Sequence, residues 1–212
     1  MNQIEKRELT GKLQYDNTVI LTYQIDYPVI TKSRWNEGKE KFNEYNRQKA
    51  KRLEFYVITE LFEEAKRTYE YNKNQGYPIM VYEVVVSYQI TYNQSYFVSL
   101  YRDAYSYTGG AHGNTIRSSQ NWNLLKGECI PLQRWYQDDC SCIIEILREI
   151  NRQITERTKQ EPGTYFDNFC GLVLESINLK NYYKVERGIV IFFEQYDIAP
   201  YSTGIPEFVI LH

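Results

Sequence analysis

Residues 82–103 read YEVVVSYQITYNQSYFVSLYRD, and they carry the clearest secondary-structure pattern in the chain. In both halves apolar and polar side chains tend to alternate, and both are rich in β-branched and aromatic residues, which favour strands. Asn93-Gln94 separates the halves and has the character of a turn. The stretch therefore predicts a β-hairpin.

The residues before this hairpin predict a strand pair followed by a long helix. Residues 9–30, LTGKLQYDNTVILTYQIDYPVI, alternate on both sides of a turn at Asp16-Asn17. From about residue 33 to residue 74, apolar residues recur at steps of three and four, and Gly76 then stops the pattern. This periodicity predicts one long helix, or two helices in tandem.

The residues after the hairpin predict one further strand, then a helix, then a group of short strands. The helix lies near residues 138–160, and Asp138 or Asp139 is its expected cap. Residues 181–211 predict a strand, a turn at Arg187-Gly188, a second strand, a loop and a third strand.

Strands and helices thus come in blocks and not in strict βαβ alternation, which predicts an α+β fold with a mainly antiparallel sheet. We expect a long helix in the N-terminal half and a second helix near residues 138–160. We also expect one compact unit with two sub-regions. Residues 1–77 form the strand pair and helix, and residues 78–212 carry two loops, SYTGGAHGN and IAPYSTG.

Composition excludes some classes of function. The chain has 25 basic and 27 acidic residues, so no broad basic face points to nucleic acid as a partner. No run of about 18 apolar residues could span a membrane, and the first residues lack the apolar region of a signal peptide. We therefore expect membrane attachment only through an anchor absent from this sequence. The 21 tyrosines favour a binding surface, because tyrosine gives contact area at low entropic cost.

His112 lies in SYTGGAHGN, residues 106–114, and is the one internal histidine. A hydrolase would need Ser106 as nucleophile and Asp103 to orient the imidazole, but their nearness in sequence does not create a triad geometry. No Cys-x-x-Cys or His-x-x-x-His spacing indicates a metal site. We therefore expect no catalytic residue, no metal and no cofactor, although two carboxylates of a glycosidase could escape recognition in any sequence.

A structural role accounts for more of this motif. Gly109 and Gly110 permit positive φ, and Gly113 allows close approach of other groups to the backbone. A histidine in such a shaped loop usually hydrogen-bonds to nearby backbone groups through its ring nitrogens. We predict this role for His112.

The cysteines leave two interpretations open. Cys129, Cys140, Cys142 and Cys170 are even in number, so an extracytoplasmic chain could form two disulfides by three pairings. The Cys140–Cys142 pair is the least favoured, because residues two apart on a helix point to different sides. Some of the four could equally be small buried residues.

Three stretches carry a family resemblance: SYTGGAHGN, then NWNLLKGECIPL at residues 121–132, and GIVIFFEQYDIAPYSTGIPEFVI at residues 188–210. Together they resemble the extracellular domain of RsiV-type anti-sigma factors, which is also found as the N-terminal module of PdaC-type peptidoglycan deacetylases. The resemblance extends over nearly the whole chain. One departure lies at Asn123–Gly127, where the family commonly has Asp and then Thr.

This resemblance implies an extracytoplasmic module on the outer side of a bacterial membrane. RsiV-like members bind lysozyme, whereas PdaC-like members carry their chemistry on a separate metal-dependent domain whose ligands this chain lacks. We therefore expect a binding or sensor domain that recognises a lysozyme-like protein. The alternatives are a module that binds cell-wall glycan and, less favoured, an extracellular hydrolase.

Two loops are the expected binding site, because each follows an apolar strand and places tyrosines among conformationally restricted residues. The first loop contributes Tyr105, Ser106, Tyr107, Thr108, Gly109, Gly110 and His112, and the second contributes Tyr196, Pro200, Tyr201 and Gly204. We expect the two loops to meet at one end of the sheet.

Overall fold

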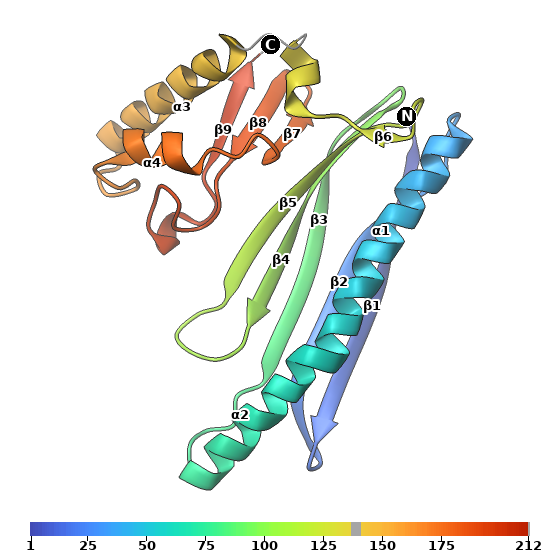
Figure 1. The fold of residues 1–212 in the computed structure, drawn as a ribbon, viewed down its shortest axis with the longest axis vertical. Coiled ribbons are helices and arrows are strands. Elements are labelled where there is room, and N and C mark those ends of the chain that lie inside the picture. Colours follow the sequence, from blue (N-terminus) through green and yellow to red (C-terminus); the bar gives the residue numbers. More distant parts are fainter. Residues whose placement is uncertain (137–140, 212) are drawn as a thin grey trace. The chain divides into compact units, whose positions relative to one another are not determined.

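The computed structural model describes residues 1–136 and 141–211, which form two β-sheets and several helices (Figure 1). Contacts divide the chain into two compact units. Unit 1 is Met1–Tyr88 with Arg102–Ile116, and unit 2 is Gln89–Tyr101 with Arg117–His212. The chain thus passes from one unit to the other inside the hairpin strands. The expected division of one compact unit into sub-regions 1–77 and 78–212 stays a prediction.

The larger sheet has six strands in the order β1-β2-β3-β4-β5-β6. These are β1 (Gln3–Tyr15), β2 (Thr18–Lys32), β3 (Tyr82–Gln94), β4 (Phe97–Tyr107), β5 (Asn114–Asn123) and β6 (Glu128–Cys129). β1 pairs with β2 and β5 with β6 in antiparallel fashion, whereas β2 and β3 are parallel. The predicted α+β fold with a mainly antiparallel sheet is confirmed.

The two expected turns of this sheet differ in outcome. Asp16 and Asn17 form the turn between β1 and β2, with φ of 49° and 58°, as their tolerance of left-handed backbone predicts. The predicted turn at Asn93-Gln94 is wrong, since β3 continues to Gln94 and the chain turns at Ser95, whose φ is 52°. The backbone carbonyl after that residue accepts a hydrogen bond from Leu124 N–H at 2.7 Å, which ties the turn to the end of β5.

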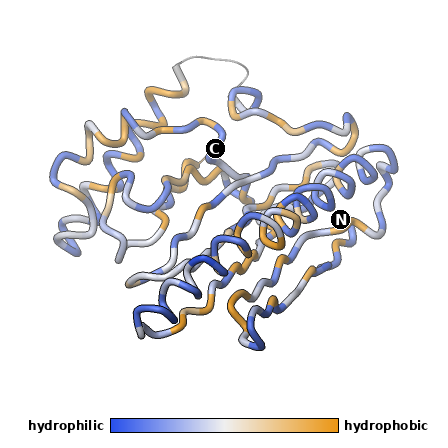
Figure 2. Tube along the Cα trace, turned by 60° about the horizontal axis from the view of Figure 1, so that its bottom comes forward, coloured by the Kyte–Doolittle hydropathy of each residue, from blue (hydrophilic) through white to orange (hydrophobic). Residues whose placement is uncertain are grey.

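The predicted long helix is confirmed as three consecutive segments: α1 (Asn36–Tyr56), a π-helical turn (Val57–Leu61) and α2 (Phe62–Gln75). It connects strands β2 and β3, which are parallel neighbours. Parallel neighbours can be joined only by a long crossover, and this helix provides it. Figure 2 shows the helix as mostly hydrophilic, with hydrophobic residues recurring along it. Gly76 ends it in the left-handed conformation, with φ of 71°.

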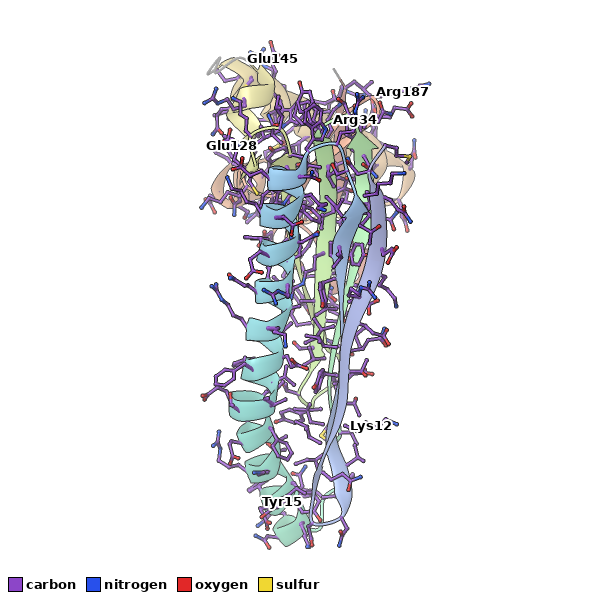
Figure 3. The ribbon with its side chains drawn as sticks, turned by 90° about the vertical axis from the view of Figure 1, so that its right-hand side faces the viewer. Lys12, Tyr15, Arg34, Glu128, Glu145 and Arg187 are labelled. Atoms are coloured by element: carbon purple, nitrogen blue, oxygen red, sulfur yellow. The ribbon has the colours of Figure 1, made fainter. Side chains whose placement is uncertain are left out.

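The recurring apolar residues of this helix pack on the larger sheet within unit 1. The buried cluster joins Ala50, Val57, Leu61, Ala65 and Tyr69 of the helix to Ile20, Leu21, Ile25, Tyr82, Val84 and Val86 of β2 and β3. At the far end of β1, Tyr15 lies beside α2 (Figure 3), and its ring meets Tyr69 edge-on at 5.5 Å. The hydroxyl of Tyr69 donates to Asp16 at 3.1 Å, so the helix also holds the β1–β2 turn.

Unit 2 contains the smaller sheet, in the order β7-β8-β9, and two helices beside it (Figure 1). The elements are α3 (Ser141–Gln160), α4 (Phe169–Ser176), β7 (Tyr182–Val185), β8 (Gly188–Phe192) and β9 (Glu207–Leu211), with short 3-10 turns at Leu132–Tyr136 and Tyr201–Thr203. The helix predicted near 138–160 is confirmed as α3, and its expected caps lie outside the described residues. α4 was not predicted.

A row of isoleucines on α3 provides the core of this unit. Ile146, Ile150 and Ile154 are fully buried against the apolar face of β8 and β9 and against Val173 of α4. The turn between β7 and β8 falls at Glu186 and Arg187, one residue before its predicted place.

A buried polar network joins β7 to strands of the larger sheet inside unit 2. Asn121 on β5 donates to the Tyr182 carbonyl at 2.9 Å, and the Ser99 hydroxyl on β4 donates to Asn121 Oδ1 at 2.7 Å. The Lys184 backbone N–H donates to Ser99 Oγ at 2.9 Å. β7 is therefore hydrogen-bonded to β8 on one side and to these side chains on the other.

The start of β8 leaves no room for a side chain at Gly188. A Cβ there would overlap the carbonyl oxygen of Ile210 on β9. We predict that Gly188→Ala lowers the free energy of unfolding of unit 2 by about 2 kcal/mol, because backbone cannot yield as a flexible side chain can. Urea denaturation followed by circular dichroism measures this loss.

Gly171 in α4 is the matched control, because a Cβ there would meet no atom within 4 Å. Gly171→Ala should raise the stability slightly, by roughly 0.5 kcal/mol, through its helix propensity. Equal stability of the Gly188→Ala variant and the parent would contradict the assigned packing of β8 on β9.

Candidate functional site

The first candidate loop connects β4 and β5 and is shaped by glycines. Gly109 and Gly110 have φ of 105° and 92°, which confirms that both need the freedom of glycine. The Tyr107 hydroxyl donates to the Gly110 carbonyl at 3.1 Å, so this side chain closes the loop on itself. Thr108 at the tip is exposed.

His112 makes the type of contact that the sequence predicts. Its Nδ1 lies 3.0 Å from the carbonyl oxygen of Gly113, and Nδ1–H is the donor because a carbonyl can only accept. Gly113 itself is buried under the ring of Tyr105, at a place where a Cβ would overlap that ring. Close approach at this glycine is confirmed, and the approaching group is an aromatic ring.

The second candidate loop connects β8 and β9 and presents a pair of tyrosines. Tyr196 is 52% exposed and has a φ of 70°, a left-handed conformation that is rare for an aromatic residue. Its ring lies 5.7 Å from that of Tyr201, with 32° between the ring planes. Pro200 precedes the 3-10 turn that begins at Tyr201, and Gly204 ends that turn with a φ of 74°.

Several contacts fix the backbone of this loop. Ile198 and Ala199 are buried in the core of unit 2, and the Ile198 carbonyl accepts a hydrogen bond from Phe166 N–H at 3.2 Å. The Thr203 hydroxyl donates to the Thr164 carbonyl at 2.7 Å. The tyrosine pair is therefore carried by a backbone held at both ends.

Asp197 lies in this loop, and no pattern in the sequence singles it out. Its carboxylate accepts the Glu194 backbone N–H at 3.0 Å and so closes the turn that carries Tyr196. Burial raises the pKa of Asp197 above its usual 3.8, while this hydrogen bond opposes the rise. The loop thus contains an acid whose charged form is disfavoured by its surroundings.

An ion pair between a nearly buried arginine and a partly exposed glutamate lies at the base of the second loop. Arg117 on β5, whose side chain is 9% exposed, forms a salt bridge with Glu207 at the start of β9. The guanidinium lies 3.8 Å from the ring centroid of Tyr101, and the Tyr183 hydroxyl donates to Glu207 Oε1 at 2.9 Å. The Arg117 backbone N–H donates to Glu194 Oε2 at 3.2 Å, so one residue contacts both ends of the loop.

The structure brings candidate residues together within each loop. Tyr105 packs on Gly113, Tyr107 reaches Gly110, and Tyr196 contacts Tyr201. The first loop belongs to unit 1 and the second to unit 2, so a patch formed by both loops stays a prediction. Within the described residues, no group of three or more His, Cys, Asp or Glu side chains could hold a metal ion.

Of the cysteines, Cys142 is buried, and Cys129 and Cys170 are exposed. Cys140 lies outside the described residues. The structure forms no disulfide among Cys129, Cys142 and Cys170, so the expected set of two disulfides is not formed, and the alternative of a small buried residue holds for Cys142.

Two family models match the chain. Residues 14–115 match the model described as deacetylase PdaC, and residues 137–211 match the model described as a protein of unknown function, DUF3298. The resemblance to the PdaC-type and RsiV-type module, which the loop motifs predicted, is confirmed. None of the curated proteins matches the chain.

Two solved structures have the same fold. A member of the DUF3298 family from Bacteroides fragilis NCTC 9343 aligns with a TM-score of 0.70 at 17% identity, covering 99% of this chain and 90% of that chain. A DUF3298 family protein from Pseudomonas aeruginosa PAO1 aligns with a TM-score of 0.58 at 14% identity, covering 100% of this chain and 91% of that one.

The family matches make this chain a domain associated with the bacterial cell envelope. Domains of these families are typically extracellular. Across residues 1–136 and 141–211, no helix is both long and apolar enough to cross a membrane.

The ion pair at the base of the second loop gives a stability prediction. Glu207→Gln removes a carboxylate that forms a salt bridge with Arg117 and should destabilise unit 2 by about 2 kcal/mol, because a nearly buried guanidinium loses a charged partner. Urea denaturation at pH 7 measures the loss. Glu156→Gln on α3 is the control, since Glu156 pairs with Arg152 at the surface and its loss should cost well under about 1 kcal/mol.

Asp197 gives a pH prediction. Because its pKa is raised in the folded protein, its protonated form adds stability that is complete below pH 3.8 and is lost as the pH rises through the folded-state pKa. Asp197→Asn keeps an acceptor for Glu194 N–H and removes this loss. The variant should therefore gain stability relative to the parent between pH 3 and pH 7, as thermal unfolding across this range would show. A constant difference at all pH values would contradict the buried environment of Asp197.

Proposed function

We propose that this domain recognises a lysozyme-like protein outside the cell, through the two loops at residues 105–114 and 196–204. The observation that carries the proposal is the contact of the exposed Tyr196 with the half-buried Tyr201 on a backbone anchored to the core. Large aromatic side chains on a rigid loop bury much area on binding and lose little conformational entropy. Tyrosine is also among the residues that dominate binding energy at protein interfaces.

The kind of partner is inferred from the resemblance, because RsiV-like members bind lysozyme. Charge adds modest support. The chain has a net charge of −2, and the second loop contains Glu194 and Asp197, which would favour a basic partner over an acidic one. Burial raises the pKa of Asp197 and so disfavours its charged form, which makes Asp197 the weaker contributor to this attraction.

The two loops should contribute unequally. The Tyr107 hydroxyl is engaged within its own loop, so Tyr107 orders the loop as well as offering a ring to the partner. Tyr201 is part of an aromatic pair on a loop that the core of its unit holds in place. We therefore expect the larger loss of affinity from changes at Tyr201.

Calorimetric titration with a panel of lysozymes tests the proposal. Tyr201→Ala should weaken the tightest complex by about 2 kcal/mol, which is roughly thirtyfold in affinity. Tyr107→Ala should weaken it by less, and Tyr107→Phe, which keeps the ring, separates the ring from the hydroxyl. Tyr71→Ala is the matched control, since Tyr71 is 60% exposed on α2, away from both loops in the sequence.

Thermal unfolding must first show that each variant is folded. The proposal fails if the parent binds none of the lysozymes. It also fails if neither Tyr201→Ala nor Tyr107→Ala changes the affinity, or if Tyr71→Ala changes it as much as they do.

A further inference from the structure

Strand β1 forms one edge of the larger sheet and lies in unit 1. It extends over 13 residues, more than twice the most common strand length of about 5–6 residues. Its inner side pairs with β2, so alternate backbone N–H and C=O groups along its outer side point away from the sheet. An edge of this kind is a template for the addition of another strand.

The outer side of β1 is not capped. Within the described residues, no side chain and no loop hydrogen-bonds to the backbone of residues 4–13 on this side. The edge strand β9 of the smaller sheet differs, because side chains of α3 donate to its carbonyl groups. Arg157 donates to the Glu207 carbonyl at 2.9 Å, and Gln153 donates to that of Val209 at 2.8 Å. The other edge strand of the larger sheet, β6, has only two residues.

Four consecutive residues of β1 are charged and exposed: Glu5, Lys6, Arg7 and Glu8. Lys12 points away from the long helix (Figure 3), and Lys6 and Glu8 share its face, because successive side chains of a strand alternate. Glu5 and Arg7 lie on the opposite face. Lys6 Nζ is 3.3 Å from Glu8, and the Arg7 guanidinium is 3.5 Å from Glu5. Each face thus carries one acid and one base, two residues apart.

This order of charges is complementary to itself. When two copies of one strand pair in antiparallel fashion about a two-fold axis, residues at equal distances on either side of the axis lie opposite each other. With the axis at Lys6, Glu5 of each copy lies opposite Arg7 of the other. Opposite charges in such positions stabilise a strand pair, and like charges destabilise it. A strand with charges of one sign would therefore repel its copy, whereas β1 attracts it.

The position of the axis follows from how the basic residues are compensated. An axis at Lys6 places the two Lys6 side chains opposite each other, but Asp26 at 3.1 Å and Glu8 at 3.3 Å already compensate this charge. An axis at Arg7 would place two arginines opposite each other, each compensated by Glu5 at the longer distance of 3.5 Å. Residues 4–8 also lie between the two register shifts of β1, where the strand is regular.

We propose that β1 is the interface of a homodimer, in which two copies of this chain pair in antiparallel fashion along β1 and join their larger sheets. The two-fold axis passes at Lys6, and reciprocal contacts between Glu5 and Arg7 flank it. Main-chain hydrogen bonds of the added strand provide the affinity, and the charges set the register. The interface uses no residue of the two candidate loops, so it goes beyond the proposed function.

Sedimentation velocity of the whole chain at increasing concentration measures the dimer. Glu5→Arg places arginines opposite each other and should weaken the dimer by at least about tenfold, because two-fold symmetry changes both contacts at once. Arg7→Glu should weaken it to a similar degree. An equimolar mixture of these two variants should dimerise as tightly as the parent, because every contact then joins an arginine to a glutamate.

Three further measurements define the interface. Lys12→Glu is the matched control, because it makes the same change of charge as Arg7→Glu on the same strand but outside the paired residues, and it should leave dimerisation unchanged. Lys6→Gln should leave the affinity unchanged or raise it, because Lys6 lies opposite its own copy. Amide hydrogen exchange should slow at alternate residues within 4–8 as the concentration rises, since their outer N–H groups then donate to the other copy.

Thermal unfolding must show that each variant is folded, and a variant with a folding defect could not restore the dimer on mixing. The proposal is overturned if the parent stays monomeric up to about 1 mM, or if the mixture associates no better than its components. It is also overturned if Lys12→Glu weakens the dimer as much as Arg7→Glu does, or if amide exchange within residues 4–8 does not depend on concentration. A loss of affinity in Lys6→Gln as large as that in Glu5→Arg overturns the axis at Lys6.

Discussion

Unit 2 depends on the buried polar network that holds β7 against Ser99 and Asn121. Each polar group in it is satisfied: Asn121 donates to the Tyr182 carbonyl, and the Lys184 N–H donates to Ser99. A network of this kind lowers the stability of the fold when one of its groups lacks a partner, because that buried group has lost its hydrogen bonds to water and gained none in the protein. The network therefore fixes the register of β7 more strictly than apolar packing alone would.

That register sends two adjacent tyrosines to opposite sides of β7. The Tyr182 hydroxyl accepts the indole N–H of Trp135, and the Tyr183 hydroxyl donates to Glu207 at the base of the second loop. Neighbouring side chains on a strand point to opposite faces, so a slip of one residue would exchange these roles and disrupt both regions. Burial raises the pKa of each hydroxyl, which keeps both as neutral donors across the physiological range. One short strand thus supports both the segment that carries Trp135 and the base of the second loop.

Local patterns in the sequence predicted most of the elements. The helix before Gly76, the β1–β2 turn at Asp16 and the positive φ of Gly109 all follow from periodicity or from residue type. The hairpin turn was predicted two residues too early, because asparagine is a common turn residue and Asn93 was taken as the turn. The strand continues past Asn93, and the residue with left-handed backbone is Ser95. The pair Arg117–Glu207 joins residues 90 apart, and an arginine in an alternating strand gives no sign of which face it occupies. The contact of Trp135 with Tyr182 likewise joins distant segments, and no local pattern encodes it.

From composition alone, the many tyrosines indicated a binding surface. In the structure, these tyrosines fall into two groups. Tyr69, Tyr182 and Tyr183 are buried, and their hydroxyls hold turns, rings or ion pairs in place. These tyrosines act as structural ties, because a phenol combines a large apolar ring with one donor that can reach a specific acceptor. Tyr196 differs, since it is exposed and its backbone adopts a conformation that an aromatic residue rarely tolerates. A strained backbone persists only where surrounding contacts impose it. The hydrogen bond of Asp197 and the buried Ile198 beside it are such contacts, so backbone conformation, more than residue count, distinguishes the tyrosine that we propose for partner binding from those that hold the fold.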